Sequence, residues 1–158
     1  LDVPNVARIT MESLYDPIDN HLQTPDMIWA HATSTKPGDR LEAHALYRAL
    51  GELLKDTPIA AIKSSLGHTM GAAGALNLIA AVQSLHNDSI PHILNLNNPQ
   101  LKVEKQADEY DEFDAEVEKN IFPALIRNRP LEFRHDSGLV VAYGFGGHNA
   151  SVLIRRHA

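Results

Sequence analysis

The chain has 158 residues, 44% of them hydrophobic, which is typical of one domain with a sizeable core. Its net charge of −6 disfavours a nucleic-acid partner, because nucleic-acid backbones attract basic surfaces, and the lack of cysteine excludes disulfides and thiolate metal sites. No stretch approaches the roughly 18 apolar residues of a membrane span. We therefore expect a soluble, cytoplasmic protein with no nucleic-acid partner and no membrane span. The first residues contain neither an initiator Met nor a signal-peptide pattern, so we expect a piece of a longer protein.

The first quarter of the chain predicts a helix, a strand and a second helix. A loose helical pattern covers residues 6–21. A short strand-like run at residues 27–30 then leads directly into His31. Apolar positions recur at close to a 3.6-residue period over residues 39–55, which predicts a helix with Asp39 as its N-cap.

The middle of the chain predicts a strand, a buried helix and an edge strand. A short apolar run at residues 59–62 leads into Lys63. Residues 71–85 are apolar on almost all sides, which is typical of a helix buried between layers. Residues 90–96 form a poorer strand that belongs at a sheet edge, because Pro91 cannot donate to a ladder.

The last part of the chain begins with an acidic segment at residues 102–120, which we interpret as a solvated loop or a short surface helix without chemistry. Residues 139–143 and 150–154 are expected to form an antiparallel pair of strands joined by a glycine-rich connection. The order of these elements predicts a mixed sheet covered by helices.

Three short segments carry side chains suited to catalysis. Residues 31–35 read HATST, residues 63–74 read KSSLGHTMGAAG, and residues 143–149 read YGFGGHN. His68 in the second segment precedes a predicted helix, whose positive N-terminal end disfavours an imidazolium. We therefore expect a neutral His68 that donates a hydrogen bond to a developing oxyanion.

Other interpretations of the histidines stay open. Taken alone, His31 fits an ordinary polar turn. Residues 63–74 lack both the G-x-x-x-x-G-K-[ST] and the G-x-G-x-x-G order of phosphate-binding turns. A zinc site made of His31, His68 and His148 would lack the close ligand spacing of known zinc motifs. We therefore expect neither a phosphate nor a metal site.

Lys63 and Phe145 each allow two interpretations. If Lys63 is buried at the end of its strand, its ammonium needs a carboxylate, and Glu42 or Asp39 could supply it. Both acids could equally lie exposed on their helix. Phe145 stands among glycines at residues 144–147, where it could gate a pocket or simply join the core.

Taken together, the three segments resemble the C-terminal half of the β-ketoacyl-[acyl carrier protein] synthases, which are ketosynthases or condensing enzymes of the thiolase-like superfamily. Residues 31–42 match the family pattern H-G-T-x-T-x-x-x-D-x-x-E, residues 63–74 match K-x-x-x-G-H-x-x-G-A-A-G, and residues 144–149 match G-F-G-G-x-N. The resemblance implies an α/β fold, the C-terminal half of a thiolase-like αβαβα layered fold with a mixed β-sheet covered by helices. It implies one domain over residues 1–158, with an acidic surface insertion at about residues 101–121.

The resemblance implies the chemistry of a decarboxylative Claisen condensation of malonyl carrier protein with an acyl thioester, in fatty-acid or polyketide synthesis. On this basis His31 and His68 are catalytic residues that donate hydrogen bonds to the malonyl thioester oxygen as the enolate forms. Lys63 and Glu42 form the supporting ion pair. The enzyme class is therefore an acyltransferase.

The resemblance also assigns substrate contacts and turns. Thr33 and Thr35 hold the phosphopantetheine arm, and Phe145 acts as the gate between the acyl pocket and the malonyl site. The structural turns are expected to depend on five glycines, Gly67, Gly71, Gly144, Gly146 and Gly147. Two positions depart from the family, because Ala32 replaces a glycine and Tyr143 replaces a common phenylalanine.

The implied partners follow from the reaction. Acyl carrier protein brings the phosphopantetheine with the substrate, so we expect no resident cofactor, and the full enzyme is expected to be a homodimer. The family's nucleophilic cysteine lies in an N-terminal half that is absent here, so the 158-residue chain alone is expected to be inactive. The alternative is a non-catalytic partner subunit of the chain-length-factor type, and a thiolase is a more distant possibility.

Overall fold

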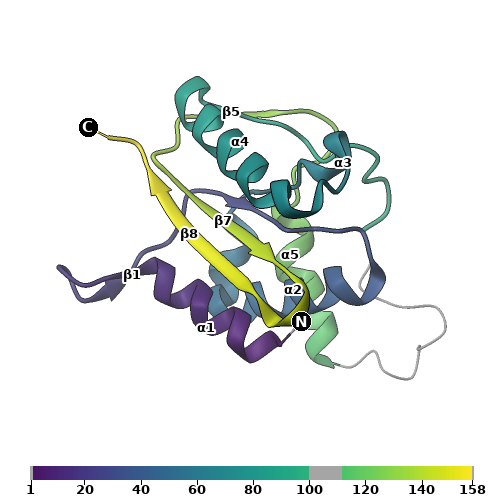
Figure 1. Cartoon of the computed structure of the whole chain (residues 1–158), viewed down its shortest axis with the longest axis horizontal. Coiled ribbons are helices and arrows are strands. Elements are labelled where there is room, and N and C mark those ends of the chain that lie inside the picture. Colours follow the sequence, from purple (N-terminus) through teal and green to yellow (C-terminus); the bar gives the residue numbers. More distant parts are fainter. Residues whose placement is uncertain (1, 100–111, 158) are drawn as a thin grey trace.

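The computed structural model describes residues 2–99 and 112–157 and contains a four-stranded mixed sheet (Figure 1). The strands are β3 (Ile28–Trp29), β4 (Ile59–Ala60), β7 (Ser137–Tyr143) and β8 (Asn149–Arg155), arranged in the order β4-β3-β7-β8. Strand β3 pairs in parallel with both β4 and β7, and β8 runs antiparallel to β7. The predicted mixed sheet and its antiparallel pair at the end of the chain are confirmed.

Helices cover both faces of this sheet. Helices α1 (Val3–Leu14), α2 (Lys36–Leu50) and α5 (Glu112–Ala124) lie on one side, and α4 (Ala73–Asn87) lies on the other (Figure 1). Alternate residues of β7 point to opposite faces, so Leu139 and Val141 join the core under α1, α2 and α5 while Val140 joins the core under α4. The apolar run of β7 is therefore buried on both faces.

The first helix is shorter than its pattern predicts. Helix α1 ends at Leu14, and a small antiparallel hairpin of β1 (Tyr15–Asp16) and β2 (His21–Leu22) replaces its expected last turns. Pro17 explains the difference, because proline disfavours the helical conformation of the residue before it and cannot donate within a helix. Asp16 accepts a hydrogen bond from the backbone N–H of Ile18 at 2.8 Å, which stabilises the turn.

The second helix starts and ends earlier than expected. Its N-cap is Thr35, and Asp39 lies in its first turn instead. Helix α2 stops at Leu50 because Gly51 adopts a positive φ of 58°, and a 3₁₀ helix, η1 (Gly51–Asp56), follows.

Helix α4 is buried on one face only, unlike the helix buried on almost all sides that its composition predicts. It follows a short helix α3 (Lys63–Leu66) and a 3₁₀ turn η2 (Met70–Ala72). Ala73, Asn77 and Ala81 form a buried stripe at four-residue spacing toward the sheet. The opposite side leaves apolar side chains exposed, namely Leu78, Ile79 and Val82.

The acidic segment is only partly as expected. Residues 101–111 of the predicted insertion lie outside the described residues. The remainder forms α5, which is not a surface helix, because its Val117 is fully buried in the core and its Asp114 carboxylate is fully buried too. The strand expected at residues 90–96 is limited to β5 (Ser89–Ile90), which pairs with β6 (Leu131–Glu132) in a separate small sheet.

No helix among the described residues is long and apolar enough to cross a membrane.

Candidate active site

The three segments singled out in the sequence meet at one edge of the sheet, which we call the carboxyl edge. His31 follows β3, Lys63 follows β4 and Tyr143 ends β7, and these parallel strands all finish at this edge. The His31 and His68 rings are perpendicular, with centroids 5.5 Å apart. The Tyr143 ring also packs against His31, at a centroid distance of 5.3 Å.

Glu42 holds the backbone of His31. The N–H of His31 donates to Oε1 of Glu42 and the N–H of Ala32 donates to Oε2, each at 2.7 Å. Burial raises the pKa of Glu42 to about 7, while these two hydrogen bonds oppose that rise. Ala32 has a φ of +38°, a conformation that glycine adopts more easily, so the alanine in place of the family's glycine is strained.

Lys63 holds the same residue from its other end. Its Nζ donates to the carbonyl oxygen of His31 and lies 3.4 Å from Nδ1 of the His31 ring. The ion pair predicted between Lys63 and Glu42 is wrong, because Glu42 is occupied by backbone N–H groups and Lys63 by a carbonyl and an imidazole. Burial lowers the pKa of Lys63, and the nearby Glu42 and Asp39 carboxylates partly oppose this. Together, the two side chains fix His31 rather than each other.

His31 is neutral near pH 7. Burial, followed by the charges of Lys63 and His68, lowers the pKa of His31 to about 4. An ammonium can only donate, so Nδ1 of His31 accepts from Lys63 and the ring proton lies on Nε2. The charge of Lys63 polarises the ring and strengthens Nε2–H as a donor.

His68 has the same arrangement of hydrogen bonds. The backbone N–H of Met70 donates to Nδ1 of His68 at 3.3 Å, so a neutral ring carries its proton on Nε2. Met70 has a φ of +53° and Gly67 a φ of +76°, so the loop that carries His68 bends through two left-handed residues. Within the part of the chain that the structure describes, neither His31 nor His68 has a partner at Nε2.

Thr33 and Thr35 follow His31 closely in the sequence, and their side chains lie next to each other in space. Thr33 and Thr35 hydroxyl oxygens are 3.0 Å apart. Gly38 is a residue that the sequence analysis missed, since a Cβ at this position would clash with Oγ1 of Thr35. A glycine inside the first turn of a helix was the available signal.

The glycine-rich connection forms a 3₁₀ turn, η4 (Phe145–Gly147), that presents Phe145 with 94% of its surface exposed. Gly146 and Gly147 have φ values of 75° and 79°, a conformation that glycine adopts far more easily than other residues. At Gly144 a Cβ would approach the carbonyl oxygen of His148 to 3.3 Å. Gly71 differs, because it has neither a positive φ nor a close neighbour.

Two further buried polar residues lie near His31, and the sequence analysis missed the first of them, Asn77. Asn77 of α4 donates from Nδ2 to the carbonyl of Ala30 at 2.9 Å, which fixes the strand end just before His31. An asparagine in the middle of an apolar helix was the signal. Within the described residues the buried Tyr143 hydroxyl makes no hydrogen bond of good geometry, and burial raises the pKa of Tyr143 well above its usual value, although the Thr10 side chain opposes that rise.

No group of three or more metal-ligating side chains occurs among residues 2–99 and 112–157. Two neighbouring imidazoles at one sheet edge, each fixed through Nδ1, are suited to stabilising negative charge on an oxygen through their Nε2–H groups.

Comparison with known proteins agrees with this geometry. The family model described as "Beta-ketoacyl synthase, C-terminal domain" matches residues 3–97. The chain therefore belongs to this family of condensing-enzyme domains, and the resemblance identified in the sequence is confirmed.

Three similar proteins illustrate the relationship. The "Tetracenomycin polyketide synthase ketoacyl synthase alpha subunit" of Streptomyces glaucescens is 32% identical over 153 residues, which cover 95% of this chain and 32% of that protein. A ketosynthase solved as a "type II PKS acyl-carrier protein in complex with its ketosynthase" has a TM-score of 0.77 at 22% identity, covering 98% of this chain and 33% of the other. "The ishigamide ketosynthase/chain length factor" has a TM-score of 0.65 at 28% identity, covering 85% and 28%.

These likenesses confirm the predicted α/β class and the C-terminal part of a thiolase-like fold. The chain spans only about a quarter to a third of the length of the curated relatives it matches.

Proposed function

We propose that this domain supplies the decarboxylating part of a β-ketoacyl synthase active site, and that it acts on malonyl groups carried by acyl carrier protein in fatty-acid or polyketide synthesis. The observation that carries the proposal is the pair of imidazoles, His31 and His68, whose ring centroids are 5.5 Å apart and whose Nδ1 atoms are both engaged by donors. A thioester oxygen placed between their Nε2–H groups would receive two hydrogen bonds.

The reaction needs this arrangement at the moment carbon dioxide leaves. When the bond between the malonyl α-carbon and its carboxylate breaks, the electron pair forms an enolate whose charge lies largely on the thioester oxygen. Prearranged donors meet that charge without reorganisation, which lowers the barrier. The enolate carbon then attacks an acyl thioester on a cysteine, and the cysteine thiolate leaves.

The other groups of the site have supporting roles. Lys63 and Glu42 keep His31 in place, and the charge of Lys63 helps to keep its ring neutral. Thr33 and Thr35 bind the phosphopantetheine arm, and Phe145 closes the malonyl site against the acyl pocket. The exposure of Phe145 fits a ring whose contacts come from outside the described residues.

The partners follow from the same proposal. Acyl carrier protein delivers the phosphopantetheine, so no resident cofactor is required. The nucleophilic cysteine comes from an N-terminal half of the full enzyme, which works as a cytoplasmic homodimer. The 158-residue chain has no cysteine and is inactive alone.

A second candidate is a non-catalytic subunit of the chain-length-factor type. The similarity to a ketosynthase/chain length factor structure supports this alternative. A subunit that performs no decarboxylation has no need for two fixed Nε2–H donors. The geometry of His31 and His68 therefore favours the catalytic role.

The test is release of carbon dioxide from malonyl carrier protein by the intact protein. His31→Ala and His68→Ala are each expected to lower the rate roughly 10²–10³-fold, as removal of one oxyanion donor does elsewhere. His86→Ala, on the exposed side of α4, is the matched control and should leave the rate unchanged. An intact protein that joins acyl groups without releasing carbon dioxide would be a thiolase, and one whose complex is unaffected by either change would be a structural partner.

A further inference from the structure

Helix α5 carries a fully buried carboxylate that the proposed reaction does not use. Asp114 accepts hydrogen bonds from Arg40 Nε at 2.8 Å and Arg40 Nη2 at 2.6 Å, and its Oδ1 lies 2.6 Å from Nε2 of His44. Arg40 and His44 are one turn apart on α2, so a single carboxylate bridges that turn of the helix. The Phe113 ring adds to the contact by packing edge-on against His44, with centroids 5.0 Å apart.

The turn of α2 held by Asp114 is the turn that holds His31. Glu42 lies between Arg40 and His44 in the sequence, and its two carboxylate oxygens accept the N–H groups of His31 and Ala32 at 2.7 Å. Asp39 in the same turn accepts the N–H of Ser34 at 3.1 Å. Contacts from α5 and contacts to the active-site loop therefore share a single helical turn.

The loop after β3 needs this restraint because its backbone is strained. Ala32 and Ser34 have φ values of 38° and 61°, and neither is a glycine. Such conformations persist only where surrounding contacts hold them. If α2 shifted, the Glu42 bonds would lengthen and the loop would relax, taking His31 away from His68 and Tyr143.

We propose that Asp114 is a positioning residue for His31, acting through Arg40, His44 and the Glu42 turn of α2. The bidentate pair between Asp114 and Arg40 fixes the position of α2 along its axis and its rotation about that axis, because two parallel hydrogen bonds resist both movements. This inference rests on the proposed function only for its effect on catalysis. The effect on the geometry of His31 is independent of it.

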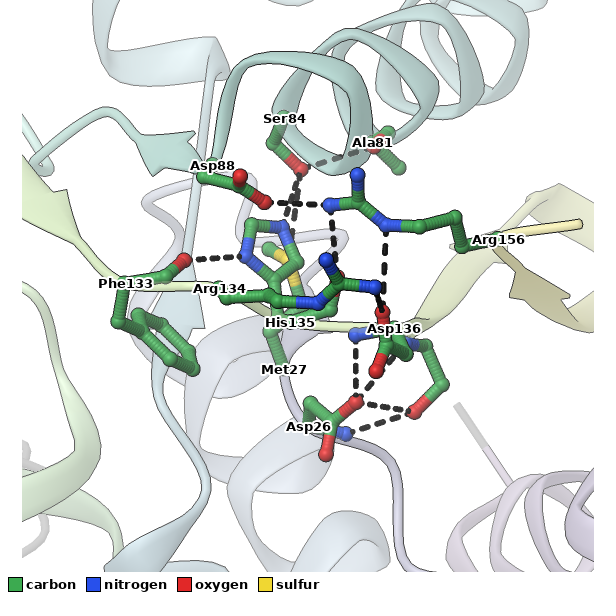
Figure 2. A network of polar contacts seen from close by, with 11 residues as sticks. Asp26, Met27, Ala81, Ser84, Asp88, Phe133, Arg134, His135, Asp136 and Arg156 are labelled. Atoms are coloured by element: carbon green, nitrogen blue, oxygen red, sulfur yellow. Dashed lines mark hydrogen bonds and ion pairs between the residues drawn. The ribbon is translucent and has the colours of Figure 1, made fainter. Parts of the chain in front are cut away.

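The experiment compares Asp114→Asn with Asp136→Asn in the intact protein. Asp136 is the matched control, because it pairs with Arg134 and Arg156 at 3.3 and 3.2 Å but lies at the opposite edge of the sheet (Figure 2). The two readouts are the NMR titration of the His31 ring, assigned with His31→Gln, and the steady-state kinetics of malonyl decarboxylation.

Asp114→Asn is expected to move the pKa of His31 from about 4 toward its ordinary value of 6.5, because the released ring becomes more solvated. It is expected to lower kcat roughly 10-fold with little change in KM, as for a small misplacement of a catalytic group. Asp136→Asn should change neither. Loss of stability in Asp114→Asn with an unchanged His31 titration and unchanged kcat would overturn the proposal, since a purely structural anchor behaves in that way.

A second variant covers the case in which Asp114→Asn does not fold. Arg40→Lys keeps the charge but loses the bidentate geometry, and a smaller His31 shift in the same direction is expected. No shift in a folded Arg40→Lys protein would also overturn the proposal. If the unmodified protein releases no carbon dioxide, the proposed function fails, while the His31 titration still decides the role of Asp114.

Discussion

Histidines at the two ends of the sheet differ in how many of their ring nitrogens have hydrogen-bond partners. At the edge where β3 and β7 begin, which we call the amino edge, His135 is 2% exposed and both ring nitrogens have partners, the Phe133 carbonyl at 3.0 Å and Ser84 Oγ at 3.1 Å (Figure 2). At the carboxyl edge, the described residues provide the His31 and His68 rings with partners only at Nδ1. A saturated imidazole contributes stability, whereas a fixed ring with one free N–H can bind something else.

The surroundings of the two edges differ in the same sense. At the amino edge, Asp26 accepts hydrogen bonds from the N–H groups of Asp136 and Ser137 at 2.9 and 2.8 Å, and Arg156 bonds to Asp88 and Asp136 (Figure 2). This network joins the starts of β3 and β7 to the end of β8. The carboxyl edge instead has a strained loop after β3, so stability and function occupy opposite edges of one sheet.

The largest expected effect is a loss of activity from a substitution at the carboxyl edge and a loss of stability from a substitution at the amino edge. His68→Ala should lose roughly 10²–10³-fold in decarboxylation with little change in stability, because His68 is exposed. His135→Leu should leave the rate per folded molecule unchanged and lower the free energy of unfolding by about 1–3 kcal/mol, because the Phe133 carbonyl loses its buried donor. Urea denaturation and the decarboxylation assay check both variants. Equal losses of activity would break the comparison.

The next effect is a pH dependence of stability at the carboxyl edge. Burial raises the pKa of Glu42 from 4.5 to about 7, so between these values the folded state binds more protons and stability falls as pH rises. Burial, with Lys63 and His68, lowers the pKa of His31 from 6.5 to about 4, so there the unfolded chain binds more protons and stability rises with pH.

These opposing contributions can be separated by two variants. Glu42→Gln should leave the His31 contribution, with stability rising from pH 4 to 6.5, and His31→Gln should leave the Glu42 contribution, with stability falling from pH 4.5 to 7. Denaturant unfolding at several pH values measures the slopes. The same slope in both variants would show that neither group titrates as stated.

Relief of backbone strain should give a smaller effect. Ala32→Gly is expected to raise the free energy of unfolding by about 1 kcal/mol, because glycine accepts the φ of 38° that alanine resists. Ala75→Gly, at an exposed position of α4, is the control and should lower it by about 1 kcal/mol. A loss of stability in both would mean that the loop after β3 is not strained.

The smallest effect concerns the Tyr143 hydroxyl. Tyr143→Phe should stabilise the protein by about 1 kcal/mol, because it removes a buried hydroxyl that makes no hydrogen bond of good geometry within residues 2–99 and 112–157. Tyr15→Phe, whose exposed hydroxyl donates to Asn20 at 2.7 Å, should change the stability by less than about 0.5 kcal/mol. A clear loss in Tyr143→Phe would reveal a hydrogen-bond partner in the rest of the intact protein.

Much of the fold was predictable because each element has a local signature. The short apolar run before His31 and the alternating burial of Leu139, Val140 and Val141 have the period of strands, and α2 has the period of a helix. The errors came where a local pattern met a stronger constraint. Pro17 ended α1 early. The second part of the acidic segment forms α5, whose apolar side chains pack into the core through tertiary contacts.

The sequence predicted which residues form the candidate site, but only some of the contacts between them. Residue types at fixed spacing pointed to His31 and His68, and the loop glycines with positive φ followed from the turns they form. The pairing of Lys63 with Glu42 was wrong, because opposite charge suggests attraction but says nothing of the backbone groups that compete for each side chain.

The sequence by itself determined the order of strands and helices, the family, and the presence of two histidines and a lysine in the right segments. Tertiary structure alone decided which nitrogen of each ring stays free, and what holds His31 in place. The physical reason is distance along the chain. Lys63 meets a ring 32 positions away, and Asp114 meets an arginine 74 positions away, so these contacts exist only once the sheet and its helices have packed.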